Sequence, residues 1–291
     1  MNQQEFTKRI RKEGYHSYFD GNLPVATETL FATEPLIIRG DIESGVTLIV
    51  EGDVTVEGSV FDASLTATGS VTITESFIGA GKGKIVSGIN VTVKAVNAQT
   101  IVAKGNIAIG VEALNADIRA YDTIDAHDAR IIGGKAEASN EITVKNLGSE
   151  DGRQTKVYLG NRKKLLQRIN DIAAEEKSLN ERLPRIVKCI YRWNRIKVEG
   201  ITLTEEQDTM LAKLRVMRDS FPRQAEIFKK ETDQLKSLLK EKIDSTLVIK
   251  GAIHENVLVD INGFKEVNDT MLQSVQFYMG VHTLQKAPLK M

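Results

Sequence analysis

The sequence predicts a mainly β chain with an α insertion: a right-handed parallel β-helix interrupted by a long antiparallel coiled-coil hairpin. Three observations support this prediction. Short alternating strands repeat over residues 35–160, heptad spacing replaces them over residues 161–245, and the strand pattern returns over residues 246–291. Hydrophobic residues make up 41% of the 291 residues but aromatic residues only 5%. The core must therefore be built mainly from aliphatic side chains.

Charge and cysteine content exclude several classes of protein. The 39 basic and 39 acidic residues cancel, which argues against nucleic-acid binding by an overall basic surface. Cys189 is the only cysteine, so neither an internal disulfide nor a cysteine zinc site can form. No apolar run reaches the length of a signal peptide or a membrane span. We therefore expect a cytoplasmic protein without membrane insertion.

Residues 1–34 form a short segment that we expect to cap the first coil, and several of its residues are charged. After it, an aliphatic triplet recurs with steps of 17, 20, 16, 17 and 18 residues. Alternation of period two indicates strands with one buried face. Repeats of this length are typical of one coil of a parallel β-helix. We expect the first residues of the triplets to stack as an internal ladder: Val54, Val71, Val91, Ile107, Ile124 and Ile142.

A second aliphatic run precedes each triplet and predicts another side of the coil. It occupies residues 48–50, 65–67, 85–86, 101–103 and 118–120. An antiparallel sandwich is the alternative, but the two-strand unit recurs in the same order each time. We expect the third side to close through small pairs, namely Asp62-Ala63, Asn97-Ala98, Asn115-Ala116 and Asp128-Ala129.

Residues 161–245 predict the hairpin. Apolar residues recur at alternating spacings of four and three, which is a heptad seam; its first helix carries Leu165, Ile169, Ile172, Leu179, Leu183, Ile186, Ile190 and Trp193, with Glu176 in the gap. Thr204 and Gln207 have the spacing of a capping box that opens the second helix. The second seam predicts Leu214, Phe221, Phe228 and Leu235, alternating with Met210 or Leu211, Met217, and Leu238 or Leu239.

Two prolines divide the predicted hairpin. Pro184 lies 23 residues after Asn161, and Pro222 lies 23 residues before Ser245, so we expect them at the same height. Each should interrupt its helix, because proline lacks the amide donor. Beyond the hairpin, strands return at residues 246–251 and 257–261. The weak alternation over residues 271–279 predicts a cap for the open end of the solenoid.

Two runs and the order of elements carry a family resemblance. GKGKIVSGINVTVKAVNAQTIVAKGNIAIG (81–110) and ARIIGGKAEASNEITVKNLGSEDGRQTKVYLG (129–160), with a coiled-coil insertion followed by KGAIHENVLVDINGF, resemble the β-helical domain of the flagellar assembly protein A family. The resemblance implies a non-enzymatic bacterial protein connected with flagellar assembly or polar placement through protein partners. Longer members resembling this chain carry a substantial N-terminal domain.

Two segments have a superficial resemblance to chemical sites. Residues 79–84 are glycine-rich, but Lys84 is followed by Ile85 and no helix opens there, so the phosphate-loop pattern fails. Asp122, Asp125, His127 and Asp128 cluster in sequence, which we interpret as a solvated face because no ligand set for a metal is present. We predict no catalytic residue, no cofactor and no metal.

The distal hairpin is the candidate partner surface. Arg185, Lys188, Arg192, Arg195 and Lys197 accompany Tyr191 and Trp193, while Glu199, Glu205, Glu206 and Asp208 face them. These charges nearly cancel, which disfavours nucleic acid. We predict that a protein partner, of unspecified identity, binds at Tyr191, Arg192, Trp193, Arg195 and Lys197; the alternative is a packed seam that ends with a tryptophan.

Two functional classes follow from this architecture. The first is a scaffold or adaptor whose rigid solenoid presents a hairpin arm. The second is a self-polymerising cytoskeletal β-helix like the bactofilins, which stack end to end, and a homo-oligomer is compatible with either. A polymer needs bare, matching apolar ends. The charged residues Lys8, Arg9, Arg11, Lys12 and Glu13 and the C-terminal tail favour the scaffold.

Overall fold

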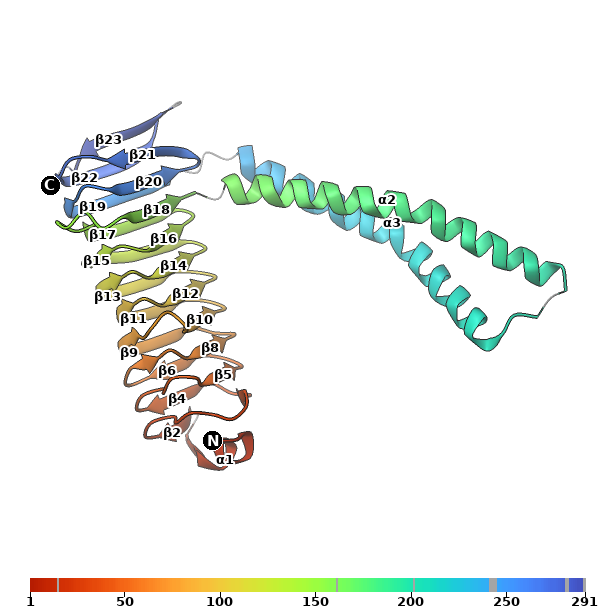
Figure 1. The fold of residues 1–291 in the computed structure, drawn as a ribbon, viewed down its shortest axis with the longest axis horizontal. Coiled ribbons are helices and arrows are strands. Elements are labelled where there is room, and N and C mark those ends of the chain that lie inside the picture. The colour runs from red at the N-terminus through yellow and green to blue at the C-terminus, as the bar shows by residue number, and fades with distance from the viewer. Residues whose placement is uncertain (15, 161, 201, 241–244, 281–282, 290–291) are drawn as a thin grey trace. The chain divides into compact units, whose positions relative to one another are not determined.

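The computed structural model describes residues 1–291 except residues 15, 161, 201, 241–244, 281–282 and 290–291. It has two compact units, each described by itself (Figure 1). The first joins Met1–Asn161 to Ile243–Met291, and the second is Arg162–Lys242. In the described part of the chain, no helix combines the length and apolarity that a membrane span requires.

The first unit is a β-solenoid made of a 13-stranded and a 10-stranded sheet. The larger sheet contains β1 (Ile10–Glu13), β2 (His16–Asp20), β4 (Leu36–Arg39), β6 (Val54–Val56), β7 (Val60–Phe61), β9 (Val71–Ile78), β11 (Val91–Asn97), β13 (Ile107–Leu114), β15 (Thr123–Ile132), β17 (Glu141–Leu147), β19 (Thr246–Ile253), β22 (Leu272–Met279) and β23 (Leu284–Pro288). The smaller contains β3 (Leu30–Ala32), β5 (Thr47–Val50), β8 (Ser64–Ala67), β10 (Lys84–Ser87), β12 (Thr100–Ala103), β14 (Asp117–Ala120), β16 (Lys135–Ala138), β18 (Thr155–Leu159), β20 (Val257–Ile261) and β21 (Phe264–Asn268).

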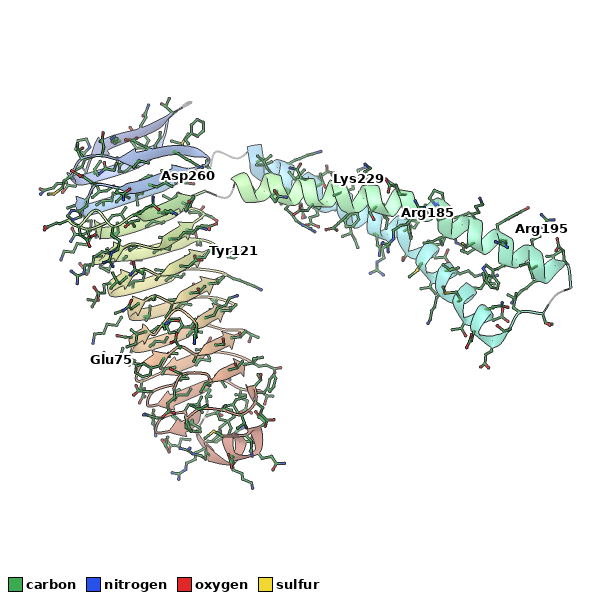
Figure 2. All side chains as sticks on the ribbon, viewed as in Figure 1. Glu75, Tyr121, Arg185, Arg195, Lys229 and Asp260 are labelled. Carbon is green, nitrogen blue, oxygen red and sulfur yellow. The ribbon has the colours of Figure 1, made fainter. Side chains whose placement is uncertain are left out.

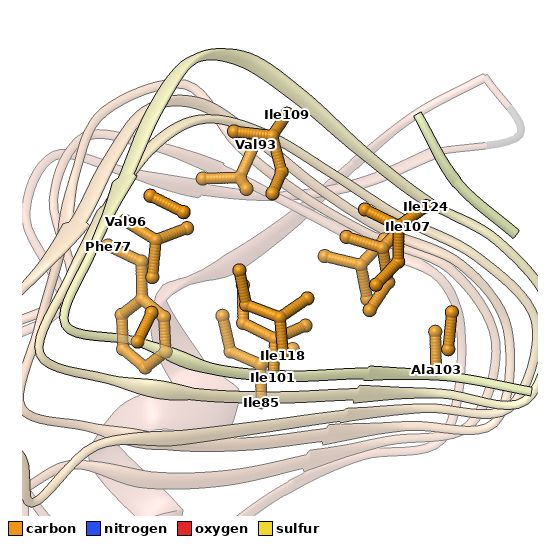
Figure 3. Close-up of a cluster of buried hydrophobic side chains, with 14 of the residues drawn as sticks. Phe77, Ile85, Val93, Val96, Ile101, Ala103, Ile107, Ile109, Ile118 and Ile124 are labelled. Atoms are coloured by element: carbon orange, nitrogen blue, oxygen red, sulfur yellow. The ribbon is translucent and has the colours of Figure 1, made fainter. Parts of the chain in front are cut away.

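The predicted internal ladder is confirmed by the strand register. Val54 pairs with Val71, Val71 with Val91, and the same column continues through Ile107, Ile124 and Ile142. All of these side chains are buried. Figure 3 shows the interior along the coils, where Ile85, Ile101 and Ile118 form a second stack opposite Ile107 and Ile124. Parallel coils thus bury one continuous aliphatic core.

A bulge divides the long strands of the larger sheet into two of the three sides of each coil. The corner after the third side uses Asp62, Ala98 and Asn115, whose φ angles are 35°, 57° and 50°. Aspartate and asparagine tolerate this left-handed conformation better than most residues. The prediction for Asp128-Ala129 is wrong: both residues lie within β15 at its bulge, between Ala126 and Arg130, and not at the corner that Asp62, Ala98 and Asn115 form.

The hairpin is inserted at a corner of the solenoid, and the same corner of the preceding coil contains only two residues. In the preceding coil, Ser139 and Asn140 join Ala138 of β16 to Glu141 of β17. Ala138 pairs with Leu159 and Glu141 pairs with Thr246, so Gly160 and Ser245 occupy the equivalent two positions. The Gly160 amide donates to the Ala138 carbonyl at 3.0 Å, and the Ser245 hydroxyl donates to the Ser139 carbonyl at 2.9 Å.

Both ends of the solenoid are capped, and its parallel strands begin within residues 1–34, at β2 and β3. At the N-terminal end, α1 (Gln3–Arg9) buries Phe6 against Phe19, with ring centroids 5.7 Å apart. The Gln3 amide group also donates to the Phe31 carbonyl and accepts from the Phe31 amide on β3. At the other end, β22 pairs with β19 and buries Phe277. The apolar end coils are therefore covered.

The second unit consists of α2 (Arg162–Val198) and α3 (Glu205–Lys240). Ile172 and Ile190 of α2 and Leu211 and Phe221 of α3 are buried, which confirms the seam in both helices. Two details of the prediction are wrong. The predicted seam residue Met217 is 52% exposed, whereas Arg218, seven residues after the buried Leu211, is half-buried.

The second correction concerns the prolines. Both Pro184 and Pro222 lie inside continuous helices, so neither ends its helix. Two contacts between α2 and α3 lie on either side of the prolines along the hairpin. Arg168 of α2 contacts Glu231 of α3 on one side, and Arg215 of α3 donates to Asn194 of α2 at 2.7 Å on the other. This antiparallel register places the two prolines at about the same height, as their positions in the sequence predict.

Candidate interaction surface

The start of α3 is fixed by a reciprocal cap. The Thr204 amide donates to the Gln207 side chain at 3.0 Å, and the Gln207 amide donates to the Thr204 hydroxyl at 3.3 Å. This is the predicted capping box. Glu205, Glu206 and Asp208 lie in the first turn of α3, where negative charge is favoured by the helix dipole. The acidic side of the hairpin tip therefore has a structural role.

The base of the hairpin is held by a bidentate ion pair. Arg168 Nε lies 2.8 Å from Glu231 Oε1, and Nη2 lies 3.2 Å from Oε2. These hydrogen bonds lower the pKa of Glu231, while the same contacts raise the pKa of Arg168. Both side chains are over one-third exposed, so solvent weakens the interaction. The pair fixes the register of α2 against α3.

The five residues predicted to bind a partner do not form one patch. Tyr191 is 70% exposed and Arg192 is exposed, whereas Trp193 is only half-exposed beside the seam. Arg195 pairs with Glu199 at 2.8 Å, and Lys197 pairs with Asp208 across the tip. Tyr191 and Arg192 thus face solvent, while Trp193 and Lys197 lie toward α3.

A different set of cations does share one face of α2. Arg185, Lys188, Arg192 and Arg195 are all exposed and follow one another at spacings of three, four and three residues. Figure 2 labels the first and the last of them, Arg185 and Arg195, on α2. Such spacing keeps side chains on one side of a helix. We call these four residues the basic stripe. Lys188 lies two positions from both Ile186 and Ile190, which places it about 200° from the seam.

The acidic residues of the tip neutralise only the distal end of this stripe, at Arg195, whereas the sequence predicted that the charges nearly cancel. Glu199 pairs with Arg195, and Asp208 pairs with Lys197. Within the part of the chain that the structure describes, Arg185, Lys188 and Arg192 have no hydrogen-bond or ion-pair partner. Counting charges in the linear sequence missed this result; the helical spacing of the cations was the signal that could have revealed it.

The glycine-rich corner at residues 79–84 is satisfied by its own neighbours. The Asp62 carboxylate accepts from the Ala80 amide at 2.8 Å, the Lys82 amide at 3.0 Å and the Gln99 side chain at 2.8 Å. Hydrogen bonds, led by that from Ala80, lower the pKa of Asp62 to about 2. These amides are therefore occupied by a carboxylate of the protein itself, and the corner is a structural element of the coil.

The polar cluster near His127 is likewise self-contained. His127 Nδ1 lies 2.7 Å from Asp125 Oδ1, and Nε2 lies 2.9 Å from Asp128 Oδ2. Asp122 lies at a corner, where it accepts from Asn140 at 2.7 Å. Among the described residues, no group of three or more histidine, cysteine, aspartate or glutamate side chains has the arrangement of a metal site.

A polar depression of about 480 Å³ lies beside the enlarged corner at residues 148–154. Its charged residues include Arg130, Arg153 and His254. Arg130 pairs with Glu112 at 2.8 Å, and Arg153 lies 3.5 Å from Asp151. The depression therefore offers less free positive charge than the basic stripe of α2.

Comparison with known proteins gave one match. The family model described as the Flagellar Assembly Protein A beta solenoid domain matches residues 31–283. No curated protein matches this chain. No solved structure matches it either.

Proposed function

Because the chain belongs to the flagellar assembly protein A family, we propose that it is a non-enzymatic cytoplasmic scaffold or adaptor. In this proposal it acts through protein–protein contacts in flagellar assembly or polar placement. The solenoid is the rigid part, and the hairpin is the part that contacts a partner. The family's name supports the flagellar context, and the structure supports the division of labour between the two units.

The observation that carries the proposal is the contrast between the two units. On the solenoid, the polar groups that resembled chemical sites are bound by neighbouring groups of the protein. Asp62 accepts from the Ala80 amide, and His127 lies beside Asp125. On the hairpin, Arg185, Lys188 and Arg192 remain exposed and unpaired within the described residues, next to the exposed Tyr191. Unpaired cations beside an exposed aromatic are typical of protein-binding surfaces, where tyrosine and arginine are enriched.

A self-polymerising β-helix is the alternative. Stacking of solenoids end to end requires open edges, whereas the edge strand β3 is occupied by the Gln3 side chain. At the other end, β21 and β23 carry Lys265 and Lys286, and β23 ends at Pro288. Lysine and proline are residues that protect edge strands from pairing. These features favour the scaffold.

The test is genetic replacement in a flagellated bacterium that carries this gene. The variant lacks residues 161–244 and joins Gly160 directly to Ser245, which restores the two-residue corner. We expect the shortened protein to accumulate while flagellar number or placement matches that of the deletion strain. The double variant Asp125→Asn, His127→Gln is the matched solenoid control and should behave as wild type. Normal flagella in the strain without the hairpin would contradict the proposed role of the hairpin.

A further inference from the structure

The distal part of α2 has three adjacent stripes. Ile186 and Ile190 belong to the seam with α3. Val187 and Tyr191 follow them by one position and are 45% and 70% exposed. Lys188 and Arg192 follow by one further position and belong to the basic stripe. Each step of one residue turns the helix by about 100°, so a buried seam, an exposed apolar flank and a cationic flank lie side by side.

The apolar flank continues toward the tip. Val198 follows Tyr191 by seven residues and is 86% exposed, and a spacing of seven keeps the two on one face. The order of stripes matches half of a helix–helix interface, in which apolar residues form the contact and charged residues flank it. Since α3 already covers the seam, the exposed flanks are available to a further helix.

We infer that this face of α2 binds an amphipathic helix of another protein whose apolar stripe is flanked by acidic residues. The inference rests on the proposed function and specifies the partner of the same hairpin. Charge complementarity selects an acidic partner, because Arg185, Lys188 and Arg192 lack partners among the described residues. The basic stripe runs from Arg185 to Arg195, which is ten helical steps or about 15 Å along the helix. A partner helix has the same periodicity, so its carboxylates can meet successive cations over that length.

The apolar flank distinguishes a helix from other anionic partners. A nucleic-acid backbone would engage the cations but leave Val187 and Val198 without apolar contacts. A membrane-surface helix carries larger apolar residues such as tryptophan, phenylalanine and leucine on its buried face. The flank of α2 has two valines and one tyrosine, which suit the close approach of a second helix.

The test uses the full chain and a synthetic peptide about three heptads long. The peptide has leucine and alanine on one stripe, glutamate beside it and no tryptophan. A fluorescein label at the end of the peptide reports binding through its fluorescence anisotropy. A second peptide with lysine in place of glutamate, phosphatidylcholine–phosphatidylglycerol vesicles and single-stranded RNA are separate arms.

We expect saturable binding of the glutamate peptide, weakened by raising the salt from about 50 to about 500 mM. Reversing three cations together, Arg185→Glu, Lys188→Glu and Arg192→Glu, should weaken binding about tenfold or more. Tyr191→Ser should weaken it at unchanged charge. The matched control Lys213→Glu, Arg223→Glu, Lys229→Glu makes the same change of net charge on exposed positions of α3. It should alter the affinity by less than about twofold.

Circular dichroism checks that each variant keeps its helix content. If a variant unfolds, the dependence of peptide binding on salt, measured with the unaltered protein, still tests the inference. Equal binding of the two peptides, or equal loss in the two triple variants, would overturn the inference. So would the absence of peptide binding, or binding of vesicles or RNA in preference to the peptide. A flagellar defect on removal of the hairpin, combined with any of these results, would retain the hairpin as the working part and reject the acidic helix as its partner.

Discussion

Gly160 and Ser245 are 85 positions apart in the sequence, yet they form the two residues of one solenoid corner. The bond from the Gly160 amide to the Ala138 carbonyl repeats the backbone contact that Tyr121 makes with Ala103 in an uninterrupted coil, and the Ser245 hydroxyl donates to the Ser139 carbonyl. The strand that follows, β19, continues the ladder by pairing Leu247 with Ile142. The hairpin is therefore inserted between two coil positions without changing the register of the solenoid.

Direct joining of Gly160 to Ser245 should consequently leave a folded solenoid. Each coil contacts only its neighbours, and no residue of the solenoid needs to move to close the corner. Far-ultraviolet circular dichroism should lose its helical contribution and retain the strand signal. A variant that joins Leu159 directly to Thr246, and so removes both corner residues, is the control and should be less stable. Aggregation of the Gly160–Ser245 variant would show that the solenoid depends on the hairpin.

The register makes opposite predictions for two adjacent residues. Val91 is fully buried, whereas Thr92 is exposed and lies between Thr72 and Ala108 in its column. Val91→Asp should destabilise the solenoid by about 4 kcal/mol, because a carboxylate would be buried without a partner. Thr92→Asp should change stability by less than about 0.5 kcal/mol. Denaturant unfolding measures both. Similar losses for the two variants would mean that the assigned faces are wrong.

Asp62 should make the solenoid sensitive to acid. Its pKa is lowered to about 2 from an ordinary value of 3.8, so its contribution to stability is complete above pH 3.8. That contribution is lost as the pH falls through about 2, because protonation removes the negative charge and converts one acceptor oxygen into a donor, which weakens the hydrogen bonds from the Ala80 and Lys82 amides. Asp62→Asn should lower the Tm at pH 7.

The difference in Tm between Asp62→Asn and the unaltered protein should shrink as the pH is lowered toward 2. Thermal melts over a pH series measure this change. Asp53→Asn is a suitable comparison, because Asp53 accepts from a single amide, that of Ser70. If the difference in Tm stayed constant over the pH series, the effect of Asp62→Asn would come from the shape of the side chain and not from the charge of Asp62.

The two prolines should destabilise the hairpin even though its helices are continuous. A proline in a helix interior removes a hydrogen bond and costs about 3 kcal/mol relative to alanine. Pro184→Ala with Pro222→Ala should therefore raise the helix content and the melting temperature of the hairpin while the solenoid transition stays unchanged. Helix content is measured at 222 nm. If flagellar placement also changes in the double variant, the prolines act as a joint; normal placement with a stiffer hairpin would reject that role.

The sequence predicted the ladder of the solenoid because buried columns need the same residue types in every coil. Val54 and Ile142 are far apart in the chain, but the repeat makes their equivalence visible. Contacts that occur once leave no such signal. The hydrogen bonds of Asp62 with Gln99 and of Gln3 with Phe31 depend on how particular coils stack, and nothing in the local sequence indicates them.

The hairpin was predictable to a similar depth. Heptad spacing identified the seam, since a buried stripe must recur every three or four residues. It did not reveal that Arg218 is more buried than Met217, because the long apolar stem of an arginine can be buried while its charged end stays in water. Local helix propensity also did not predict that α2 continues through Pro184. The helix continues because packing along the seam supports it on both sides of the proline.

Chain polarity defines the length of the solenoid. From β2 to β19 the strands of the larger sheet run parallel, but β1 and β22 run antiparallel to their neighbours, as does β21 in the smaller sheet. At the β1 edge of the larger sheet, another coil of the same kind would meet a strand of opposite direction, with a different hydrogen-bond spacing from that of the stack. At the other end, β21 presents a reversed strand at the edge of the smaller sheet, whereas β23 is antiparallel to β22 and so runs in the direction of the stack. The reversed strands therefore end the parallel stacking of coils within the chain itself, at β1 in the larger sheet and at β21 in the smaller one.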